Sequence, residues 1–360
     1  MKSRHPLRFS PSPESCWKRH DPSEHLFPTR DSLLPVSSNQ TVFTSAAANH
    51  PGATGGALNV YIISVILGIV EGLTEFLPVS STAHLRIAEG LLKINLDDAY
   101  WKMYTIVIQA GAILALLLIY LGRILDFMRT FPGGERRDRN VITHPISLTI
   151  LAFICTSIPA LLLKKWSDRN LGSLTAIAIA MLVGGVIMWA VDSWASRYEP
   201  HTTHTEEIGL GQAIWIGLCQ TTSAVFPGVS RSMSTIAAGQ LVGMDRPTAL
   251  EFSFLLSIPT MLAATAYDLW KEVLHHGKAV AVSGAAAANA VATPAPSGHV
   301  VMNTQNWIVL AIGFVVSFIV AFGVVEWFLA WVRRNGFVPF AVYRILLGIA
   351  LLIWGSRLIR

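Results

Sequence analysis

The sequence has little charge, since Asp, Glu, Lys and Arg together make up only 14% of its residues. Soluble globular domains carry about 25% charged residues. With so few charges, and with 52% hydrophobic residues, the chain cannot cover a surface that faces water on all sides. The composition therefore predicts a polytopic membrane protein. It excludes disorder of the bulk of the chain, a collagen-like repeat and a protein that coats nucleic acid.

Cysteine is also scarce. The three cysteines are scattered at Cys16, Cys155 and Cys219, and the last two lie in apolar segments. Neither a disulfide framework nor a zinc-binding spacing is present. Cys155 and Cys219 are therefore interpreted as small apolar core residues.

Residues 1–56 lack any apolar run and are rich in Ser, Pro, His and Arg. A secretory signal needs an apolar region of about 7–15 residues, and a transit peptide would be poor in acids, whereas Glu14, Asp21 and Glu24 are present. We therefore predict a disordered polar N-terminal extension over 1–56. The membrane domain is predicted over 57–360.

Six apolar stretches in that domain are close to the ~20 residues that span a bilayer; they lie near 103–122, 147–164, 172–192, 250–270, 306–332 and 338–358. Two further stretches, 58–79 and 208–227, each run into a proline and a Ser-rich turn, and a second half follows at 82–92 and 232–243. Irregular backbone at membrane depth is tolerated only inside protein or beside a wet cavity. The sequence therefore predicts an all-α membrane protein with two re-entrant helical hairpins and about six full transmembrane helices.

The two proline-centred segments also align with each other, which indicates an internal repeat. The alignment pairs Gly68 with Gly217, Glu71 with Gln220, Pro78 with Pro227 and Ser81 with Ser230. Three spans follow each hairpin, so the second hairpin is expected to enter from the opposite face, as in an inverted-topology repeat with its site near the midplane. Repeat one covers about 57–192 and repeat two about 207–360, and the Ala-, Pro- and Gly-rich segment 277–305 is predicted to be a flexible linker.

Acidic side chains mark the first hairpin as a candidate site. Glu71 and Glu75 stand four residues apart, so they share one face of a helix. An ionisable group deep in a membrane segment is costly and is a functional candidate by default. A divalent cation, or a proton on one carboxylate, would relieve the repulsion. The alternative is a pair that reaches water at the membrane interface.

Arg231 marks the second hairpin, among Ser230, Ser232, Ser234 and Thr235. A guanidinium fork matches phosphate oxygens, and the N-terminus of a helix offers free N–H donors. This pattern is typical of a phosphate cradle. An Arg that pairs with a carboxylate only for folding is the alternative.

Four motifs resemble blocks of the undecaprenyl-diphosphatase family, also called bacitracin-resistance proteins: EGLTEFLPVSSTAH at 71–84, PGVSRSMST at 227–235, EFSFLLSIP at 251–259 and FVPFAVYR at 337–344. The resemblance covers roughly residues 58–360. It implies a multi-pass phosphatase of the bacterial plasma (inner) membrane. That enzyme hydrolyses undecaprenyl diphosphate to undecaprenyl phosphate and inorganic phosphate, which recycles the lipid carrier of cell-wall synthesis and confers bacitracin resistance.

The resemblance also implies site residues and partners. The catalytic residues would be Glu71, Glu75, Ser81, His84 and Arg231; the substrate-binding residues Ser80, Thr82, Ser230, Ser232 and Thr235; and the metal ligands Glu71 and Glu75. The cofactor would be a divalent cation, Mg²⁺ or Ca²⁺, and bacitracin would compete by sequestering the lipid diphosphate. The nucleophile stays open between Ser81, His84 and water, and the oligomeric state stays open, with a homodimer as one alternative.

A lipid transporter or flippase is the rival interpretation, because inverted repeats, broken helices and charges at the midplane also occur in transporters. A flippase needs the anion clamp, but it does not need the carboxylates and the histidine. Arginines concentrate in 123–146, which slightly favours a cytoplasmic position for that loop. By resemblance, the catalytic pocket opens to the opposite, extracytoplasmic side.

Overall fold

The computed structural model describes residues 59–94, 98–133, 140–283 and 302–358. The N-terminal extension predicted over 1–56 lies outside these residues, and so does most of the linker predicted over 277–305. Residues 277–283 of this linker are helical, because the preceding helix continues to Ser283, and the next helix begins at Thr304. This stretch contains Lys and Ala, which are good helix formers, and the prolines of the segment come only later.

The described residues form α-helices and one short 3₁₀ helix, and they contain no strand. The helices are α1 (Val60–Thr74), α2 (Ser81–Leu91), α3 (Ala99–Thr130), α4 (Pro145–Asn170), α5 (Leu174–Ala195), α6 (Leu210–Val225), α7 (Arg231–Leu241), α8 (Arg246–Ser283), α9 (Thr304–Val332) and α10 (Val338–Leu358). Six of them, α3, α4, α5, α8, α9 and α10, are long and apolar enough to cross a membrane. The predicted all-α polytopic fold with about six spans is confirmed.

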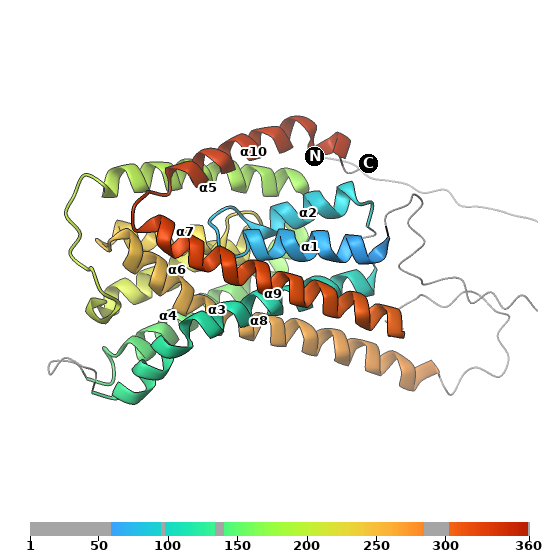
Figure 1. The fold of residues 1–360 in the computed structure, drawn as a ribbon, viewed down its shortest axis with the longest axis horizontal. Helices are drawn as coiled ribbons and strands as arrows, with labels where there is room; N and C mark the ends of the chain where they lie inside the picture. The colour runs from blue at the N-terminus through green and yellow to red at the C-terminus, as the bar shows by residue number, and fades with distance from the viewer. Residues whose placement is uncertain (1–58, 95–97, 134–139, 284–301, 359–360) are drawn as a thin grey trace, which may run out of the picture. The chain divides into compact units, whose positions relative to one another are not determined.

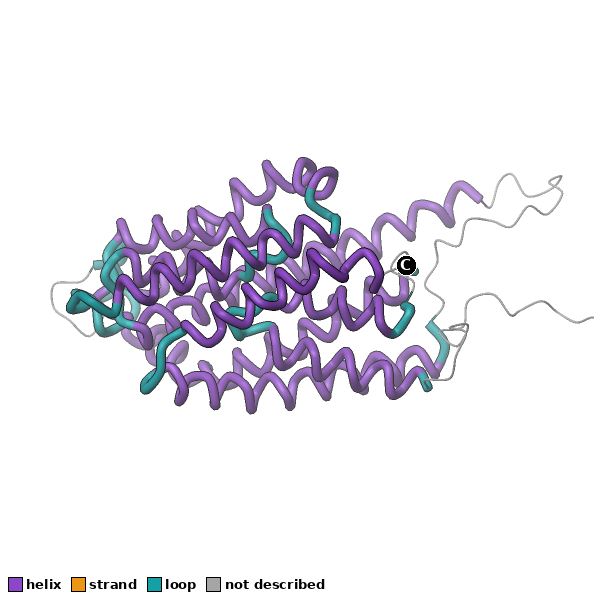
Figure 2. The backbone as a smooth tube through the Cα atoms, turned by 90° about the horizontal axis from the view of Figure 1, so that it is seen from above, coloured by secondary structure: helices purple, strands orange, loops and turns teal. Residues whose placement is uncertain are grey.

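The other four helices form the two predicted hairpins. Helix α1 has 15 residues, which at 1.5 Å per residue is about 22 Å and therefore less than the ~30 Å core of a bilayer. Helices α2, α6 and α7 are similarly short. The turns between the halves lie in the middle of the bundle, away from both of its ends (Figures 1 and 2). Each hairpin therefore reverses at membrane depth.

Helices from the two halves of the chain pack in a two-fold pattern. Helix α1 packs along α9 and its counterpart α6 packs along α4, while α5 packs along its own counterpart α10. Figure 1 shows α1 beside α9 and α5 beside α10, although each pair is far apart in sequence. Helix α1 begins at the end of the bundle where α10 ends, and α6 begins at the opposite end. This arrangement agrees with the expected inverted topology.

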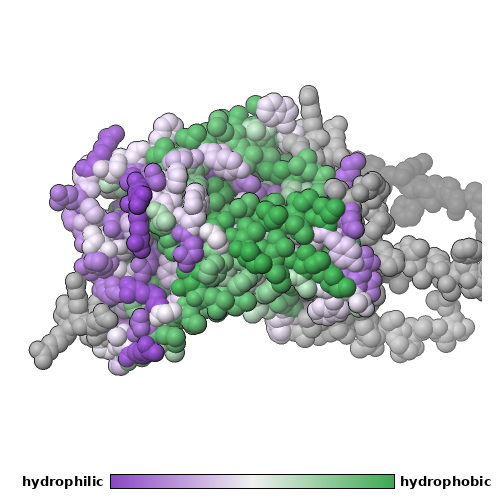
Figure 3. All heavy atoms as spheres, viewed as in Figure 1, coloured by the Kyte–Doolittle hydropathy of each residue, from purple (hydrophilic) through white to green (hydrophobic). Residues whose placement is uncertain are grey.

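Small residues allow the hairpins to lie close to the spans. A Cβ atom on Gly68 of α1 would lie 2.8 Å from the carbonyl oxygen of Gly313 in α9. Its counterpart Gly217 of α6 faces the carbonyl of Ala152 in α4 in the same way. Within lipid, helices associate through such close backbone packing rather than through the hydrophobic effect. On the face drawn in Figure 3, apolar side chains form a broad band, and polar side chains gather at the end where α9 leads into α10.

The repeat alignment is one residue out of register beyond the prolines. Ser80 and Ser230 each precede the second half-helix, and both have a left-handed backbone, with φ of 75° and 71°. The structure therefore pairs Ser80, not Ser81, with Ser230. The extra residue is Gly228, whose φ of +99° and close approach to the backbone of Ile177 suit only glycine. Ser81 thus corresponds to Arg231.

Candidate active site

The tips of the two hairpins meet inside the bundle. The guanidinium of Arg231, at the start of α7, forms an ion pair with the carboxylate of Glu75, which caps the C-terminus of α1. The hydroxyl of Ser232 also donates a hydrogen bond of 3.0 Å to the carbonyl of Leu77 in the other turn. Two predicted site residues from distant parts of the sequence are therefore in direct contact.

The carboxylates of the first hairpin are buried. Glu71 lies one helical turn before Glu75, and the two residues are 1% and 7% exposed. Among the residues that the structure describes, Oε2 of each carboxylate and Nε of Arg231 are buried without a hydrogen-bond partner. A buried polar atom without a partner costs about 1–3 kcal/mol. The tips therefore retain both acceptors and a donor for a polar ligand.

Backbone donors converge on the same place. Both α2 and α7 begin at the tips, at Ser81 and Arg231, and the first turn of any helix leaves N–H groups unpaired. The positive ends of two helix dipoles favour an anion there. The residues before them, Ser80 and Ser230, hold a strained left-handed backbone, and such strain concentrates at functional sites.

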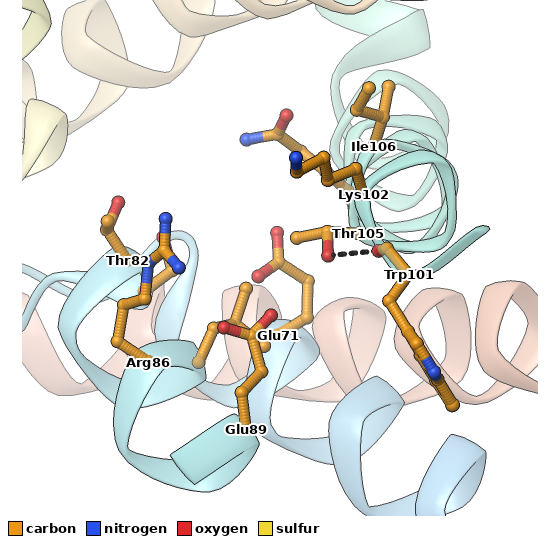
Figure 4. Close-up of a pocket in the computed structure, with 11 residues that line it drawn as sticks. Glu71, Thr82, Arg86, Glu89, Trp101, Lys102, Thr105 and Ile106 are labelled. Carbon is orange, nitrogen blue, oxygen red and sulfur yellow. Dashed lines mark hydrogen bonds between the residues drawn. The ribbon is translucent and has the colours of Figure 1, made fainter. Parts of the chain in front are cut away.

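A polar cavity of about 280 Å³ adjoins the first tip, and Ser81 and Thr82 line it together with Glu71. Figure 4 shows the carboxylate of Glu71 pointing into this cavity. Arg86 and Glu89 of α2, with Lys102, Trp101, Thr105 and Gln109 of α3, complete its polar lining. The sequence analysis did not single these residues out, because their shared cavity depends on how α2 packs beside α3.

The structure does not bring His84 to the ion pair. The imidazole Nδ1 donates to the carbonyl of Ser80 at 2.7 Å, and Nε2 accepts from the hydroxyl of Tyr343 in α10 at 2.6 Å. The two rings also stack, with an interplanar angle of 11°. In this arrangement His84 faces α10, and its two nitrogens are engaged away from Glu75.

The predicted hydroxyl residues of the second hairpin fall into two groups. Thr235 is 1% exposed, and its hydroxyl is 2.6 Å from that of Ser253 in α8. It therefore fastens α7 to α8 rather than facing open space. Ser230 and Ser232 lie at the tip, with their hydroxyls 3.1 Å apart. They are better placed to meet a ligand.

Arg344 of α10 is a residue whose role the sequence analysis missed. Its side chain is fully buried, and its guanidinium donates to the carbonyl of Pro78 at 3.2 Å and to that of Gly228 at 2.9 Å. One side chain thus holds the turns of both hairpins. Arg344 is the one charged residue in the span Val338–Gly355, and a charge inside an apolar span is a signal that could have identified it.

The residues at the first tip fit a divalent cation. Mg²⁺ and Ca²⁺ prefer oxygen ligands, and Mg²⁺ usually takes one or two carboxylates and completes its coordination with water and phosphate. Glu71 and Glu75 supply two carboxylates, each with a buried oxygen that has no partner in the described chain. The described residues contain no group of three or more His, Cys, Asp or Glu that could hold a metal by themselves. A cation here would therefore depend on water and substrate oxygens.

Comparisons with known proteins agree with this site. The model of the family described as bacitracin resistance protein BacA matches residues 64–350. The chain is 55% identical over 300 residues to the undecaprenyl-diphosphatase of Koribacter versatilis, which covers 83% of this chain and 100% of that relative. It is 41% identical over 293 residues to the undecaprenyl-diphosphatase of Rhizobium etli, covering 81% of this chain and 96% of the relative. With a match that runs from within α1 to within α10, the chain belongs to the BacA family of bacitracin resistance proteins.

Proposed function

We propose that this multi-pass membrane protein hydrolyses undecaprenyl diphosphate to undecaprenyl phosphate and inorganic phosphate. The contact between Glu75 and Arg231 carries the proposal, because it joins an acidic tip and a basic tip inside an apolar bundle. The relatives named undecaprenyl-diphosphatase support the same reaction. In the cell, the reaction would recycle the lipid carrier of cell-wall synthesis.

The reaction transfers the terminal phosphoryl group to water. The bond between the terminal phosphorus and the bridging oxygen breaks, the bridging oxygen stays on the lipid phosphate, and the oxygen of water ends in inorganic phosphate. Arg231 can donate to phosphate oxygens from its unpartnered Nε while its Nη2 pairs with Glu75. The N–H groups that begin α2 and α7 add donors, as catalysis of phosphoryl transfer by positioning and charge requires.

Glu71 and Glu75 would hold Mg²⁺ or Ca²⁺, which when bound supplies positive charge to the phosphate oxygens. The carboxylate of Glu75 also orients the guanidinium of Arg231 through their ion pair. Ser80 and Thr82 flank Ser81 where α2 begins, and Ser230 and Ser232 flank Arg231. We assign these four residues to binding the head group.

Three candidates for the nucleophile follow from the sequence: Ser81, His84 and water. Ser81 lines the cavity beside Glu71, which places its hydroxyl for attack on phosphorus or for holding the phosphate. The same cavity, of about 280 Å³, is large enough to hold water as well. His84 would first have to leave the carbonyl of Ser80 and the hydroxyl of Tyr343. The geometry therefore favours Ser81 or water over direct attack by His84.

The cavity suggests a membrane orientation. It extends from Ser81 at the start of α2 to Glu89 near the end of α2, and along the first turns of α3, toward the end of the bundle where α1 begins. Arg129, Arg197, Arg246, Arg333 and Arg334 lie at the opposite end, which the positive-inside rule assigns to the cytoplasm. We propose that the protein resides in the bacterial plasma (inner) membrane with its site open to the extracytoplasmic side. Bacitracin would compete there by binding the lipid diphosphate, and the homodimer stays a prediction.

Release of inorganic phosphate by the purified protein tests the function. We expect metal-dependent release from a long-chain polyprenyl diphosphate, and its loss in Glu75→Gln. The flippase alternative predicts movement of the lipid between the leaflets of a vesicle without release of phosphate. Absence of phosphate release by a folded wild-type protein, at any Mg²⁺ or Ca²⁺ concentration, would overturn the proposed hydrolysis.

A further inference from the structure

A second, apolar cavity lies outside the polar site. It has a volume of about 600 Å³ and lies between α5 on one side and α6 and α7 on the other. Ile179, Val183 and Ile187 of α5 form one wall, and Phe226 and Leu241 contribute to the other. All five side chains are partly exposed on the surface that faces lipid. The volume falls in the range of about 300–1,000 Å³ that is usual for ligand sites.

This apolar cavity begins at the tip that carries Arg231. Val229, Met233 and Ser234 line it, and they bracket Arg231 on both sides. From Arg231 to Ser234 the helix rises only about 4.5 Å. Ser232 and Thr235 of the same turn point elsewhere, because they bond to Leu77 and to Ser253. One side of the start of α7 thus faces the ion pair and the core, and another faces the apolar cavity.

The apolar cavity lies next to Arg231, and this position determines which lipid chain would bind in it. Acyl chains of the bilayer are as apolar as Leu, so the hydrophobic effect alone gives no preference for one lipid chain over another. A chain whose head group is already bound at Arg231 is different, because its local concentration at the neighbouring cavity becomes very high. We propose that this cavity binds the first isoprene units of the polyprenyl substrate and makes the enzyme selective for long chains. The inference rests on the proposed function, since it takes the head group to bind at the hairpin tips.

Two residues of α5 allow a matched test. Ile179 and Val186 are 49% and 48% exposed, but only Ile179 lines the cavity. A Trp at either position adds the same bulk to the lipid-facing side of one helix. Purified wild-type and variant proteins would be assayed in detergent with a polyprenyl diphosphate of eleven isoprene units and, as the short chain, with methyl diphosphate, which has no isoprene unit and does not reach the cavity.

We expect Ile179→Trp to lower the ratio of kcat/KM for the long chain over the short chain about tenfold, a change of the size that a small steric alteration in an apolar pocket produces. Val186→Trp should leave this ratio unchanged. A general disturbance of the hairpin tips would lower kcat/KM for the long and the short substrate alike, and the ratio of the two values would not change. A wild-type ratio in Ile179→Trp would overturn the proposal.

A second measurement reads the same cavity without catalysis. An isoprenoid methylenediphosphonate, which is not hydrolysed, would carry a benzophenone in its third isoprene unit. After irradiation of the wild-type protein, we expect crosslinked peptides from α5 and α7. Crosslinks confined to α1, α2 or α9 would overturn the proposal. If phosphate is not released but α5 and α7 are labelled, the hydrolase function fails while the chain-binding cavity stands.

Discussion

The ion pair between the two hairpins makes a prediction that separates folding from catalysis. We consider Glu75→Gln, Arg231→Gln and the double variant. The side chains of Glu75 and Arg231 are 4% and 16% exposed. Removal of one partner from a buried pair leaves the other charge uncompensated, which costs about 3–5 kcal/mol of stability. Because Arg231 retains a little solvent exposure, we expect the lower end, about 3 kcal/mol, for each single variant.

The double variant should be much less unstable than the sum of the singles, because two neutral amides can bond to each other across the same gap. Coupling energies of contacting pairs reach about 3 kcal/mol, so we expect the double variant to lose about 3 rather than 6 kcal/mol. Activity should behave differently. Each single should lose at least about 100-fold in turnover, as removal of a charge-stabilising group does, and the double variant should not recover.

Two assays test this reasoning. Unfolding in mixed micelles with increasing SDS gives the stability of each variant, and phosphate release from a polyprenyl diphosphate gives turnover. Arg129→Gln serves as the control, because Arg129 forms only an exposed ion pair with Asp126 and should change neither quantity. Additive losses of stability would show that the two tips are not coupled as the structure indicates. A double variant that recovers both stability and activity would show that the pair serves folding alone.

Three further predictions follow from the site and the comparisons. Arg344→Lys keeps the charge but loses the planar fork that reaches the carbonyls of both turns. The kcat should therefore fall at least tenfold with little change in KM, and wild-type values of kcat and KM would contradict a positioning role for Arg344. Glu71→Gln should raise the Mg²⁺ or Ca²⁺ concentration for half-maximal activity by at least about tenfold, whereas the exposed Glu199→Gln should not, and an unshifted metal titration would remove Glu71 from the metal site. A protein that starts at Ala57 should insert and hydrolyse substrate normally, because the relative from Koribacter versatilis aligns over its whole length to 83% of this chain; lower specific activity at equal membrane abundance would show that residues 1–56 contribute.

Much of the fold could be predicted because hydropathy and proline report on local structure. The six spans appear as apolar runs of membrane length, and the hairpins appear because a proline and a polar turn interrupt two shorter runs. The ends of the helices were harder to predict from the sequence. Helix α8, for example, continues through Lys278 and Ala279 to Ser283, within the segment predicted to be a linker. The sequence also could not show how the two repeats align after Pro78. One inserted glycine shifts the alignment there, and only the backbone angles show that Ser80 corresponds to Ser230.

The sequence assigned Glu75 and Arg231 to one candidate site, and the structure brings the two side chains into contact. An Arg paired with a carboxylate was only the alternative interpretation at the sequence level. The orientation of His84 could not be predicted, since it depends on the hydroxyl of Tyr343 from the last helix. The same limit applies to Arg344, whose side chain reaches the carbonyls of both turns only when α10 packs along α5. Such contacts between distant segments carry no local signal in a single sequence.

The two repeats have become chemically complementary while their backbones have stayed alike. Glu71 corresponds to Gln220, and Ser81 corresponds to Arg231. If the two hairpin tips were identical, either two sets of carboxylates or two guanidinium groups would meet at the midplane. Like charges repel strongly there, because the dielectric constant is low. With the acids on one tip and Arg231 on the other, the charges attract, and we expect the combined site to bind a metal on one side and phosphate on the other. A site of this polarity would accept a diphosphate in one orientation only, which is what cleavage of one particular phosphate bond requires.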